Sequence, residues 1–442
     1  MVTYPGTDRC FRLVYQSQVN EATPNQGMYS NVSRRRVLGT VIGGSLVGVA
    51  GCATDDPSSG ADEPPTDEPT PDQEDQQESS PEPDFGAVYA FGPNTVAVID
   101  PGIQEIIREF TDEFTDEDWG DPQLTLDKTE LYVIRGSPPQ VVVFDTARHE
   151  IRDMIDIGPG GTHIYHPHPE EIWAHSDDEG RFYVIDTTEH AVVETVDAGR
   201  DGEGHGKLLY HPDFEKIGYG TNVNDPGLAI IDLTTYDRTG FIEFSGSADG
   251  THYKAYSPHN ELAYVEFGDA TKIVDTTNDE VIGELPYAGG MYLTPQEERL
   301  SILDGDTIRI LDVTNTESQE IESVSVEGGP DALRYYKTDE GSLYGITANT
   351  MNNQATVLDF ESYSVINTLD IGDIERPDGA PFLHRTGMAA DDLFVTPADA
   401  DGTVALIDFS ELSVLDHVPV EEGVDTVQII ADAGTGYTGR IQ

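Results

Sequence analysis

Cysteine is almost absent from this sequence. Of 442 residues only Cys10 and Cys52 are cysteines, and both precede the repeated part of the chain. The repeated part therefore has no disulfide framework and no thiolate metal site. It also lacks a Cys-x-x-Cys-His sequence, which argues against a covalently attached c-type haem.

Basic charge is scarce as well. There are 24 Lys and Arg against 83 Asp and Glu, a formal net charge of −59, which repels nucleic acid and anionic membrane surfaces. With only two Trp and no interleaving of aromatic and basic residues, the chain offers no stacking platform for nucleic acid. Phosphate-binding loops, dinucleotide fingerprints and nucleophile elbows are also missing. The acidity is spread along the chain and resembles that of proteins from salt-in halophilic archaea.

Long helical periods are missing too, and residues 103–114 are expected to form at most a turn or two. The chain instead repeats a short apolar strand that ends in Asp. Eight such strands end at Asp100, Asp145, Asp186, Asp232, Asp275, Asp312, Asp359 and Asp408. Subtracting successive positions gives spacings of 45, 41, 46, 43, 37, 47 and 49 residues. This period predicts an all-β fold, a β-propeller of four-stranded blades.

Eight copies predict eight blades, with seven as the alternative if the closely spaced unit around Asp312 is irregular. Residues 87–91 match a second strand of a blade and have no first strand before them. Residues 425–430 are a strand at the other end of the chain, and their pairing with residues 87–91 would remove two open sheet edges. We therefore expect residues 85–442 to form one propeller closed by the C-terminal strand.

Several units carry a recognisable pattern: an aromatic-rich strand, a strand ending in Val-Ile-Asp-Thr, and a strand ending in Gly. The clearest matches are residues 182–188, 196–199, 262–265 and 369–372. These units resemble the YVTN family of propeller repeats. Similar propellers occur in the cytochrome d1 (haem d1) domain of nitrite reductases, in nitrous-oxide reductase and in several surface proteins. The resemblance covers about residues 85–442 and implies the fold, but it is poor evidence for function.

The N-terminal part resembles an export signal. We interpret residues 1–27, which show no period, as a non-native extension. In residues 28–51 a basic run containing Arg34 and Arg35 precedes an apolar segment, as in twin-arginine signals. The segment ends in Val-Ala-Gly-Cys, which resembles a lipobox and predicts lipidation of Cys52.

Residues 52–84 contain no basic residue and almost nothing apolar. Such a segment cannot bury enough surface to offset its ordering entropy, and its proline and negative charge extend it. We expect a disordered tether. Together these features predict an exported lipoprotein that is anchored to the outer face of the cytoplasmic membrane.

Three of the 12 histidines recur at the blade period, each near a glycine at the start of an inner strand. They are His163, His205 and His252, and they are 42 and 47 residues apart. The spacing predicts that they meet at the channel mouth, an arrangement suited to Zn²⁺ or Cu²⁺, to an axial haem ligand or to a general base. The alternative is that each is a polar strand residue bonded to neighbouring loops. His175 and His384 are weaker candidates for the same face.

Other polar residues are expected to have no direct role. His166, His168, His211 and His259 flank the prolines of first-to-second strand turns, and we assign them to the opposite face as surface residues. The acidic side chains near the three histidines are Asp177, Asp178, Glu179 and Asp225. In so acidic a protein we expect them to be solvated surface, with Ca²⁺ or a carboxylate ligand for the histidine metal as the alternative.

The favoured hypothesis is an exported, lipid-anchored propeller whose channel face binds a ligand, such as a metal ion, or a protein partner. The first alternative is an extracytoplasmic redox enzyme with bound haem or copper. The second is a structural cell-surface repeat protein. No catalytic nucleophile can be assigned from the sequence.

Overall fold

The computed structural model describes residues 84, 86–200, 202–214, 216–248, 250–338, 340–378 and 383–431. The extension 1–27, the signal 28–51 with Arg34 and Arg35, and Cys52 with the tether up to residue 83 lie outside the described residues. Among the residues that are described, no helix is long and apolar enough to cross a membrane.

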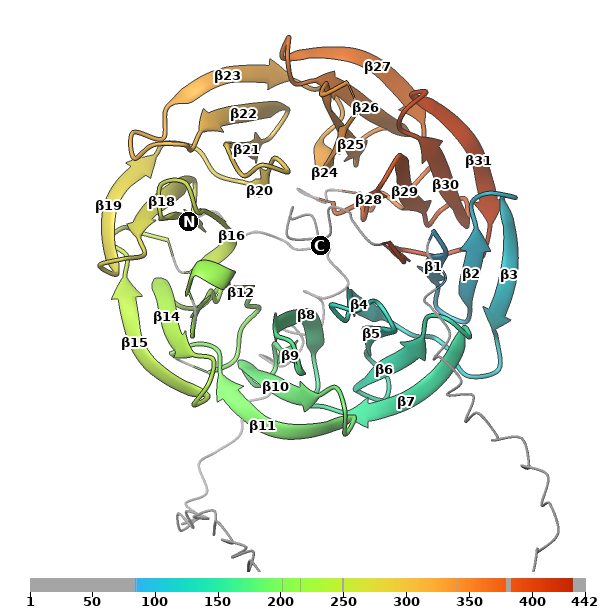
Figure 1. The fold of residues 1–442 in the computed structure, drawn as a ribbon, viewed down its shortest axis with the longest axis horizontal. Helices are drawn as coiled ribbons and strands as arrows, with labels where there is room; N and C mark the ends of the chain where they lie inside the picture. Colours follow the sequence, from blue (N-terminus) through green and yellow to red (C-terminus); the bar gives the residue numbers. More distant parts are fainter. Residues whose placement is uncertain are drawn as a thin grey trace, which may run out of the picture. The chain divides into compact units, whose positions relative to one another are not determined.

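Eight antiparallel sheets of four strands are present. They are arranged in a ring with their first strands nearest the centre (Figure 1), and we call this central region the channel. The prediction of an all-β propeller with eight blades is confirmed. The blade around Asp312 is a complete four-stranded sheet, so the seven-blade alternative is wrong. A 3-10 helix, Pro212–Phe214, is the one helical element of the described residues.

From the inner to the outer strand, the first four blades are β4 (Trp119–Leu124), β5 (Glu130–Arg135), β6 (Gln140–Asp145) and β7 (Glu150–Asp156); β8 (Gly161–His168), β9 (Glu171–Ser176), β10 (Arg181–Asp186) and β11 (Ala191–Asp197); β12 (Leu208–Leu209), β13 (Ile217–Gly220), β14 (Gly227–Asp232) and β15 (Asp237–Glu243); and β16 (Thr251–Ser257), β17 (Leu262–Phe267), β18 (Ala270–Asp275) and β19 (Glu280–Leu285).

The remaining four are β20 (Gly290–Leu293), β21 (Arg299–Asp304), β22 (Thr307–Asp312) and β23 (Glu320–Ser325); β24 (Pro330–Lys337), β25 (Leu343–Asn349), β26 (Gln354–Asp359) and β27 (Ser364–Asp370); β28 (Met388–Ala390), β29 (Leu393–Ala398), β30 (Thr403–Asp408) and β31 (Ser413–Pro419); and β32 (Thr426–Ile429), β1 (Val88–Phe91), β2 (Val96–Asp100) and β3 (Glu105–Phe110).

The last blade closes the ring as expected. β32 from the C-terminal end pairs with β1 from the N-terminal end, with Val88 opposite Ile429 and Phe91 opposite Thr426. The expectation of a helical turn in residues 103–114 is wrong, because β3 is the outer strand of this blade. An outer strand pairs on one side only and is largely solvated, which explains its weak apolar pattern.

The Asp that ends each third strand holds the turn to the fourth strand. The Oδ1 atom of Asp186 accepts hydrogen bonds from the amides of Thr188 at 2.8 Å and Glu189 at 2.7 Å. A residue with positive φ then completes the hairpin, as His190 does at +47°. Hydrogen bonds from the side chains of Thr234 and Asn278, and after them from the turn amides, lower the pKa of Asp232 and of Asp275 below its usual value. The repeated Asp is therefore a turn residue, since its carboxylate substitutes for a backbone acceptor.

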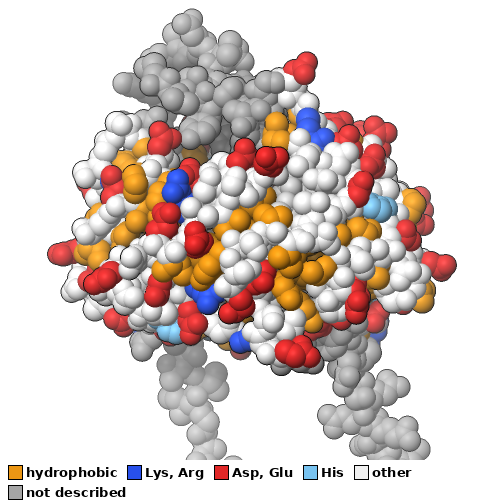
Figure 2. Space-filling model, turned by 90° about the horizontal axis from the view of Figure 1, so that it is seen from above, with side chains coloured by type: hydrophobic (Ala, Val, Ile, Leu, Met, Phe, Trp, Pro, Cys, Tyr) orange, Lys and Arg blue, Asp and Glu red, His pale blue; other side chains and the backbone are white. Residues whose placement is uncertain are grey.

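Apolar side chains pack between neighbouring blades. Phe182 and Val184 of β10, for example, form one buried cluster with Ala229 and Ile231 of β14 in the next blade. Many acidic side chains lie on the surface: Figure 2 shows Asp and Glu scattered over one side of the ring with few Lys or Arg. Because each blade buries its faces against its neighbours, the ring holds the inner strands at fixed places around the channel.

Two histidines, His149 and His190, lie in third-to-fourth strand turns and are called the turn histidines below. The Nδ1 atom of His149 lies 2.9 Å from the Tyr89 hydroxyl, and its Nε2 atom lies 2.9 Å from Asp84. His190 places Nε2 3.0 Å from Glu130 of the preceding blade. These contacts join adjacent blades and are structural.

Candidate metal centre

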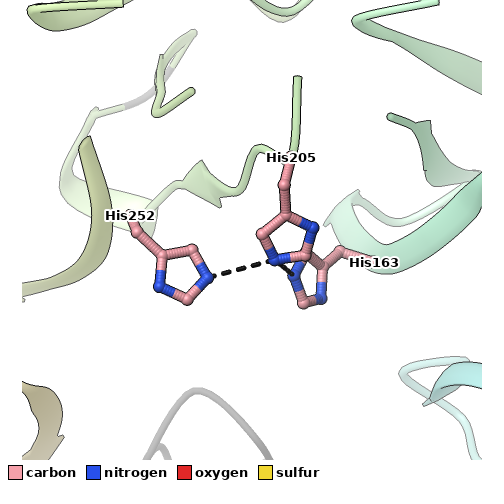
Figure 3. A group of neighbouring side chains, drawn as sticks. All are labelled: His163, His205 and His252. Carbon is pink, nitrogen blue, oxygen red and sulfur yellow. Dashed lines mark hydrogen bonds between the residues drawn. The ribbon is translucent and has the colours of Figure 1, made fainter. Parts of the chain in front are cut away.

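The three histidines at the blade period meet at the channel, and we call them the channel histidines. The Nε2 atom of His205 lies 3.0 Å from Nε2 of His163 and 3.1 Å from Nε2 of His252 (Figure 3). One nitrogen from each ring lies within 4.8 Å of those of the other two. No other group of at least three metal-ligating side chains this close together is found in the part of the chain that the structure describes.

Local irregularities of the inner strands turn these side chains toward one another. The register of β8 against β9 shifts between Gly161 and Ile164, and that of β16 against β17 shifts between Thr251 and Lys254. His163 and His252 lie inside these two bulges, although not at the same position of the bulge. His163 is the second residue inside its bulge and His252 is the first. In a regular strand this difference of one residue would point the two side chains to opposite faces, but a β-bulge redirects side chains.

His205 is held by a different local structure. It precedes the short strand β12 and lies between Gly204 and Gly206. Gly204 has a φ of +147°, and a Cβ atom on Gly206 would lie 2.5 Å from the carbonyl oxygen of Thr221. Both positions therefore require glycine, and the Gly-His-Gly sequence is needed for this close approach.

Each channel histidine has its second ring nitrogen against a carboxylate. The Nδ1 atom of His163 lies 2.6 Å from Asp121, that of His205 lies 2.7 Å from Asp177, and that of His252 lies 3.5 Å from Glu266. A carboxylate accepts a hydrogen bond from Nδ1–H, which leaves the lone pair of a neutral imidazole on Nε2. Carboxylates behind metal-binding histidines fix this tautomer and the orientation of the ring.

The surroundings keep two of the rings neutral. Burial, and after it the charge of Lys207, lowers the pKa of His163 and of His252 well below the usual value. Burial raises the pKa of Asp121 to about 6 and that of Glu266 to about 7. Burial would also raise the pKa of Asp177, but the adjacent His205 and His175 hold that pKa below its usual value. Neutral imidazole is the form that binds metal ions.

The two weaker histidine candidates are not part of the cluster. His175 is fully buried and places Nδ1 2.8 Å from Oδ1 of Asp177, so it braces the carboxylate behind His205. His384 places Nδ1 3.0 Å from Asp331, and its Nε2 atom lies 3.2 Å from the hydroxyl of Tyr253. His384 thus contacts Tyr253, the neighbour of His252 in the chain.

The four histidines assigned to the opposite face also stay outside the cluster. His166 places Nδ1 2.9 Å from the carbonyl oxygen of Glu171, and His259 places Nε2 2.9 Å from that of Gln296. His211 lies 3.5 Å from Asp213. His168 is exposed at the end of β8.

The expectation of solvated acids is wrong for two of the four residues. Asp177 and Asp225 are only 3 % and 2 % exposed. Asp177 accepts a hydrogen bond from Thr162 besides its contacts with two imidazoles, and Asp225 accepts one from the amide of Arg200. His205 of the next blade contacts Asp177, and the amide of Arg200 in the segment before β12 contacts Asp225, so tertiary contacts accompany their burial. Asp178 is exposed, as expected.

Sequence reasoning missed Asp121 and Glu266. A signal for Asp121 exists, because it lies 42 residues before His163, the same separation that joins His163 to His205. Glu266 has no such signal, since it comes from the second strand β17 and reaches His252 across the bulge.

The fold and the cluster define a class: an eight-bladed β-propeller with a three-histidine centre on its channel. No protein-family model matches the chain, and no curated protein matches it in sequence. Among solved structures it is similar to dihydro-heme d1 dehydrogenase NirN in complex with DHE, with a TM-score of 0.63 and 11% identity over 79% of this chain and 78% of that chain.

It is also similar to AztD from Citrobacter koseri. The apo form gives a TM-score of 0.56 and 13% identity over 78% of this chain and 98% of that one. A second AztD structure gives 0.55 and 14% over 77% and 96%. At these identities the likeness extends to the fold, and function has to be argued from the site.

Proposed function

We propose that this protein binds a divalent transition-metal ion, zinc or copper, through the Nε2 atoms of His163, His205 and His252. The observation that carries the proposal is the direction of the rings. All three Nδ1 atoms are turned to carboxylates, and the three Nε2 atoms face one another, two of the separations being 3.0 and 3.1 Å. Bare lone pairs at these separations repel one another, so a proton or a metal ion has to lie between neighbouring Nε2 atoms.

The dimensions support a single small ion. Tetrahedral zinc with Zn–N bonds of about 2.0 Å places its nitrogen ligands about 3.3 Å apart. The two Nε2 separations from His205 therefore need to open by only a few tenths of an ångström, and the third pair lies within 4.8 Å. Three protein ligands leave one coordination position open, as in zinc sites that exchange or activate a ligand. Imidazole also suits copper, so ligand type alone does not separate the two metals.

A second candidate function is binding of a haem-type ligand by an extracytoplasmic redox protein. It is favoured by the similarity to NirN, which was solved in complex with DHE. The geometry favours the metal ion, because a tetrapyrrole takes one axial histidine on each side of a plane, whereas here three rings meet at one point. Copper at the same three histidines would also give a redox protein.

The protein is further proposed to be exported by a twin-arginine signal and held by lipid on Cys52 at the outer face of the cytoplasmic membrane. The acidic tether 52–84 would hold the propeller away from that surface, where its channel face could also meet a protein partner. Replacing Arg34 and Arg35 by Lys should keep the precursor in the cytoplasm. Cys52→Ser should release the protein from the membrane fraction. Unchanged fractionation of both variants would contradict this proposal.

The test of the metal proposal is elemental analysis of the purified protein with a visible spectrum and a Zn²⁺ titration. We expect one Zn²⁺ or Cu²⁺ per chain, bound in competition with a chelator. A strong absorption band of a tetrapyrrole would favour the redox alternative. Absence of both metal and pigment, with no binding of added Zn²⁺ or Cu²⁺, would leave the structural cell-surface protein.

A further inference from the structure

His175 carries a polar atom that the fold itself does not use. Its side chain is fully buried, and among the described residues its Nε2 atom has no hydrogen-bond partner. The ring lies against Phe182, with ring centres 4.9 Å apart. A Cβ atom on Gly206 would lie 3.2 Å from Nε2, so the backbone next to His205 lies close to this nitrogen. A buried polar atom without a partner destabilises a fold, so stability alone would favour an apolar side chain at position 175.

The other ring nitrogen of His175 meets the carboxylate behind a channel histidine. Its Nδ1 atom lies 2.8 Å from Oδ1 of Asp177, and the second oxygen of that carboxylate, Oδ2, lies 2.7 Å from Nδ1 of His205. The hydroxyl of Thr162 donates a hydrogen bond to the same Oδ1 atom at 2.7 Å. An ionised carboxylate only accepts hydrogen bonds. Two donors therefore hold one oxygen of Asp177 and leave the other oxygen to His205.

The main chain of Asp177 is fixed as well. Its amide donates to the carbonyl oxygen of Gly160 at 2.8 Å, and its carbonyl oxygen accepts from the amide of Gly204 at 2.8 Å. With the backbone held on both sides, the direction of the carboxylate depends on rotation of the side chain, and the two donors to Oδ1 restrict that rotation. Asp177 is thus bonded to the residues that directly precede His163 and His205 in the chain.

We infer that His175 and Thr162 are positioning residues of the metal site, which fix the Asp177 carboxylate so that it holds the His205 ring in the direction that binds the ion. The inference rests on the proposed metal function. Both residues act on the ion through Asp177 and Nδ1 of His205, since a carboxylate behind a metal-binding histidine sets the tautomer and orientation of the ring. This role explains the buried Nε2 atom: the imidazole supplies the donor that Asp177 needs, and the second nitrogen comes with it.

The experiment measures the affinity of full-length variants for Zn²⁺, or for Cu²⁺ if the parent binds only that ion, by competition with a chelator. His175→Leu removes the donor, and we expect metal affinity to fall about 10-fold. In His175→Asn the side-chain amide can take the place of Nδ1 and donate to Asp177, so the affinity should stay within about 3-fold of the parent. The nitrogen NMR signal of His205 Nδ1 reports the bond to Asp177. It should move in the leucine variant and return toward its parent position in the asparagine variant.

His166→Leu is the matched control. His166 is also buried, places Nδ1 2.9 Å from the carbonyl oxygen of Glu171 and, among the described residues, has no hydrogen-bond partner on Nε2. Its bonded nitrogen meets a backbone carbonyl and not a carboxylate behind a channel histidine. His166→Leu should therefore leave metal affinity unchanged, and urea unfolding of both leucine variants separates the effect on stability from the effect on metal binding.

Thr162→Val gives a second reading if His175→Leu folds poorly. It removes the other donor to Oδ1 of Asp177 while keeping the shape of the side chain, and metal affinity should fall at least about 3-fold. Parent-like affinity in both His175→Leu and Thr162→Val overturns the inference and leaves the metal proposal standing. An equal loss of affinity in His175→Asn and His175→Leu also overturns it, because packing and not the donor would then matter. Failure of the parent protein to bind either Zn²⁺ or Cu²⁺ removes the metal proposal and this inference with it.

Discussion

The propeller carries histidine–carboxylate pairs on both of its faces, and the two groups differ in what the second ring nitrogen meets. The turn histidine His149 has Asp84 on one nitrogen and the Tyr89 hydroxyl on the other, each at 2.9 Å. The channel histidine His205 has Asp177 on one nitrogen and two other imidazoles on the second. A carboxylate partner alone therefore does not mark a metal site. The metal proposal rests instead on the convergence of several Nε2 atoms.

The acids of the two faces differ in the same way. Turn residues such as Asp275 accept hydrogen bonds from exposed side chains and amides, which lowers the pKa below 3.8. The channel residue Asp121 is buried, and burial raises its pKa from 3.8 to about 6. A rise in pH therefore has opposite effects through these two aspartates. Ionisation of Asp275 stabilises the fold because its anion is solvated and hydrogen-bonded, whereas ionisation of Asp121 destabilises the fold because its anion is desolvated.

The largest expected effect comes from removing one channel histidine. His205→Gln should lower Zn²⁺ affinity by more than about 100-fold, because a lost ligand costs more than a lost partner behind a ligand. His205 is the best choice since its Nε2 atom contacts both other rings. Zn²⁺ affinity is measured by competition with a chelator. The matched change in a turn histidine, His190→Gln, should leave the Zn²⁺ affinity unchanged. An equal loss of Zn²⁺ affinity in both variants would contradict the proposed difference between channel and turn histidines.

The next effect concerns the carboxylate behind His205. In Asp177→Asn the amide can donate to Nδ1, which moves the imidazole proton to Nε2 and removes the lone pair from the metal. Zn²⁺ affinity should fall by about 10–100-fold. Nitrogen NMR of His205 should report the changed tautomer. The control is Glu130→Gln, which alters the carboxylate bonded to the turn histidine His190. It should lower the thermal midpoint without changing Zn²⁺ affinity, and a normal affinity in Asp177→Asn would contradict the prediction.

The third effect is a pH dependence of the metal-free protein. The folded pKa of Asp121, about 6, lies above the 3.8 of an ordinary Asp, so its ionisation reduces stability as the pH rises through this range. Asp121→Asn should therefore be more stable than the parent at pH 8, by on the order of 1–2 kcal/mol, but not at pH 4. Urea unfolding measures both values.

Added Zn²⁺ provides the check on this third prediction. With the ion bound, the ionised Asp121 supports His163, so the variant should bind Zn²⁺ more weakly than the parent. If Asp121→Asn were more stable than the parent by the same free energy at pH 4 and pH 8, burial would not govern the titration of Asp121.

The smallest effect belongs to the turn acids. Asp275→Ala loses the acceptor for the amides of Thr277 and Asn278 and should cost about 1 kcal/mol in urea unfolding. Asp275→Asn keeps an oxygen acceptor and should cost less. The contribution of Asp275 is present above the unfolded pKa of 3.8 and is lost as the pH falls through its lower folded pKa, opposite in sign to Asp121. Any change in Zn²⁺ affinity in these variants would be unexpected.

Most of the fold was determined by the sequence alone. Most blades come from one continuous stretch of sequence. In each, an Asp at the end of the third strand accepts hydrogen bonds from amides that follow it, as Asp186 does from the amides two and three residues later. The number of such Asp residues from Asp100 to Asp408 therefore gave the number of blades. The unmatched strand at residues 87–91 and the spare strand at 425–430 identified the closure, because an unpaired edge requires a partner. The blade period also selected the three channel histidines.

Only the tertiary structure decided what those histidines do. The directions of His163 and His252 depend on bulges in β8 and β16, and a bulge changes the side to which a residue points without changing its place in the repeat. Their partners Asp121 and Glu266 come from an adjacent blade and from a second strand. The contact of Asp177 with His205 likewise joins two blades. A period fixes where a residue lies around the ring, whereas the chemistry of a site depends on atoms that meet across it.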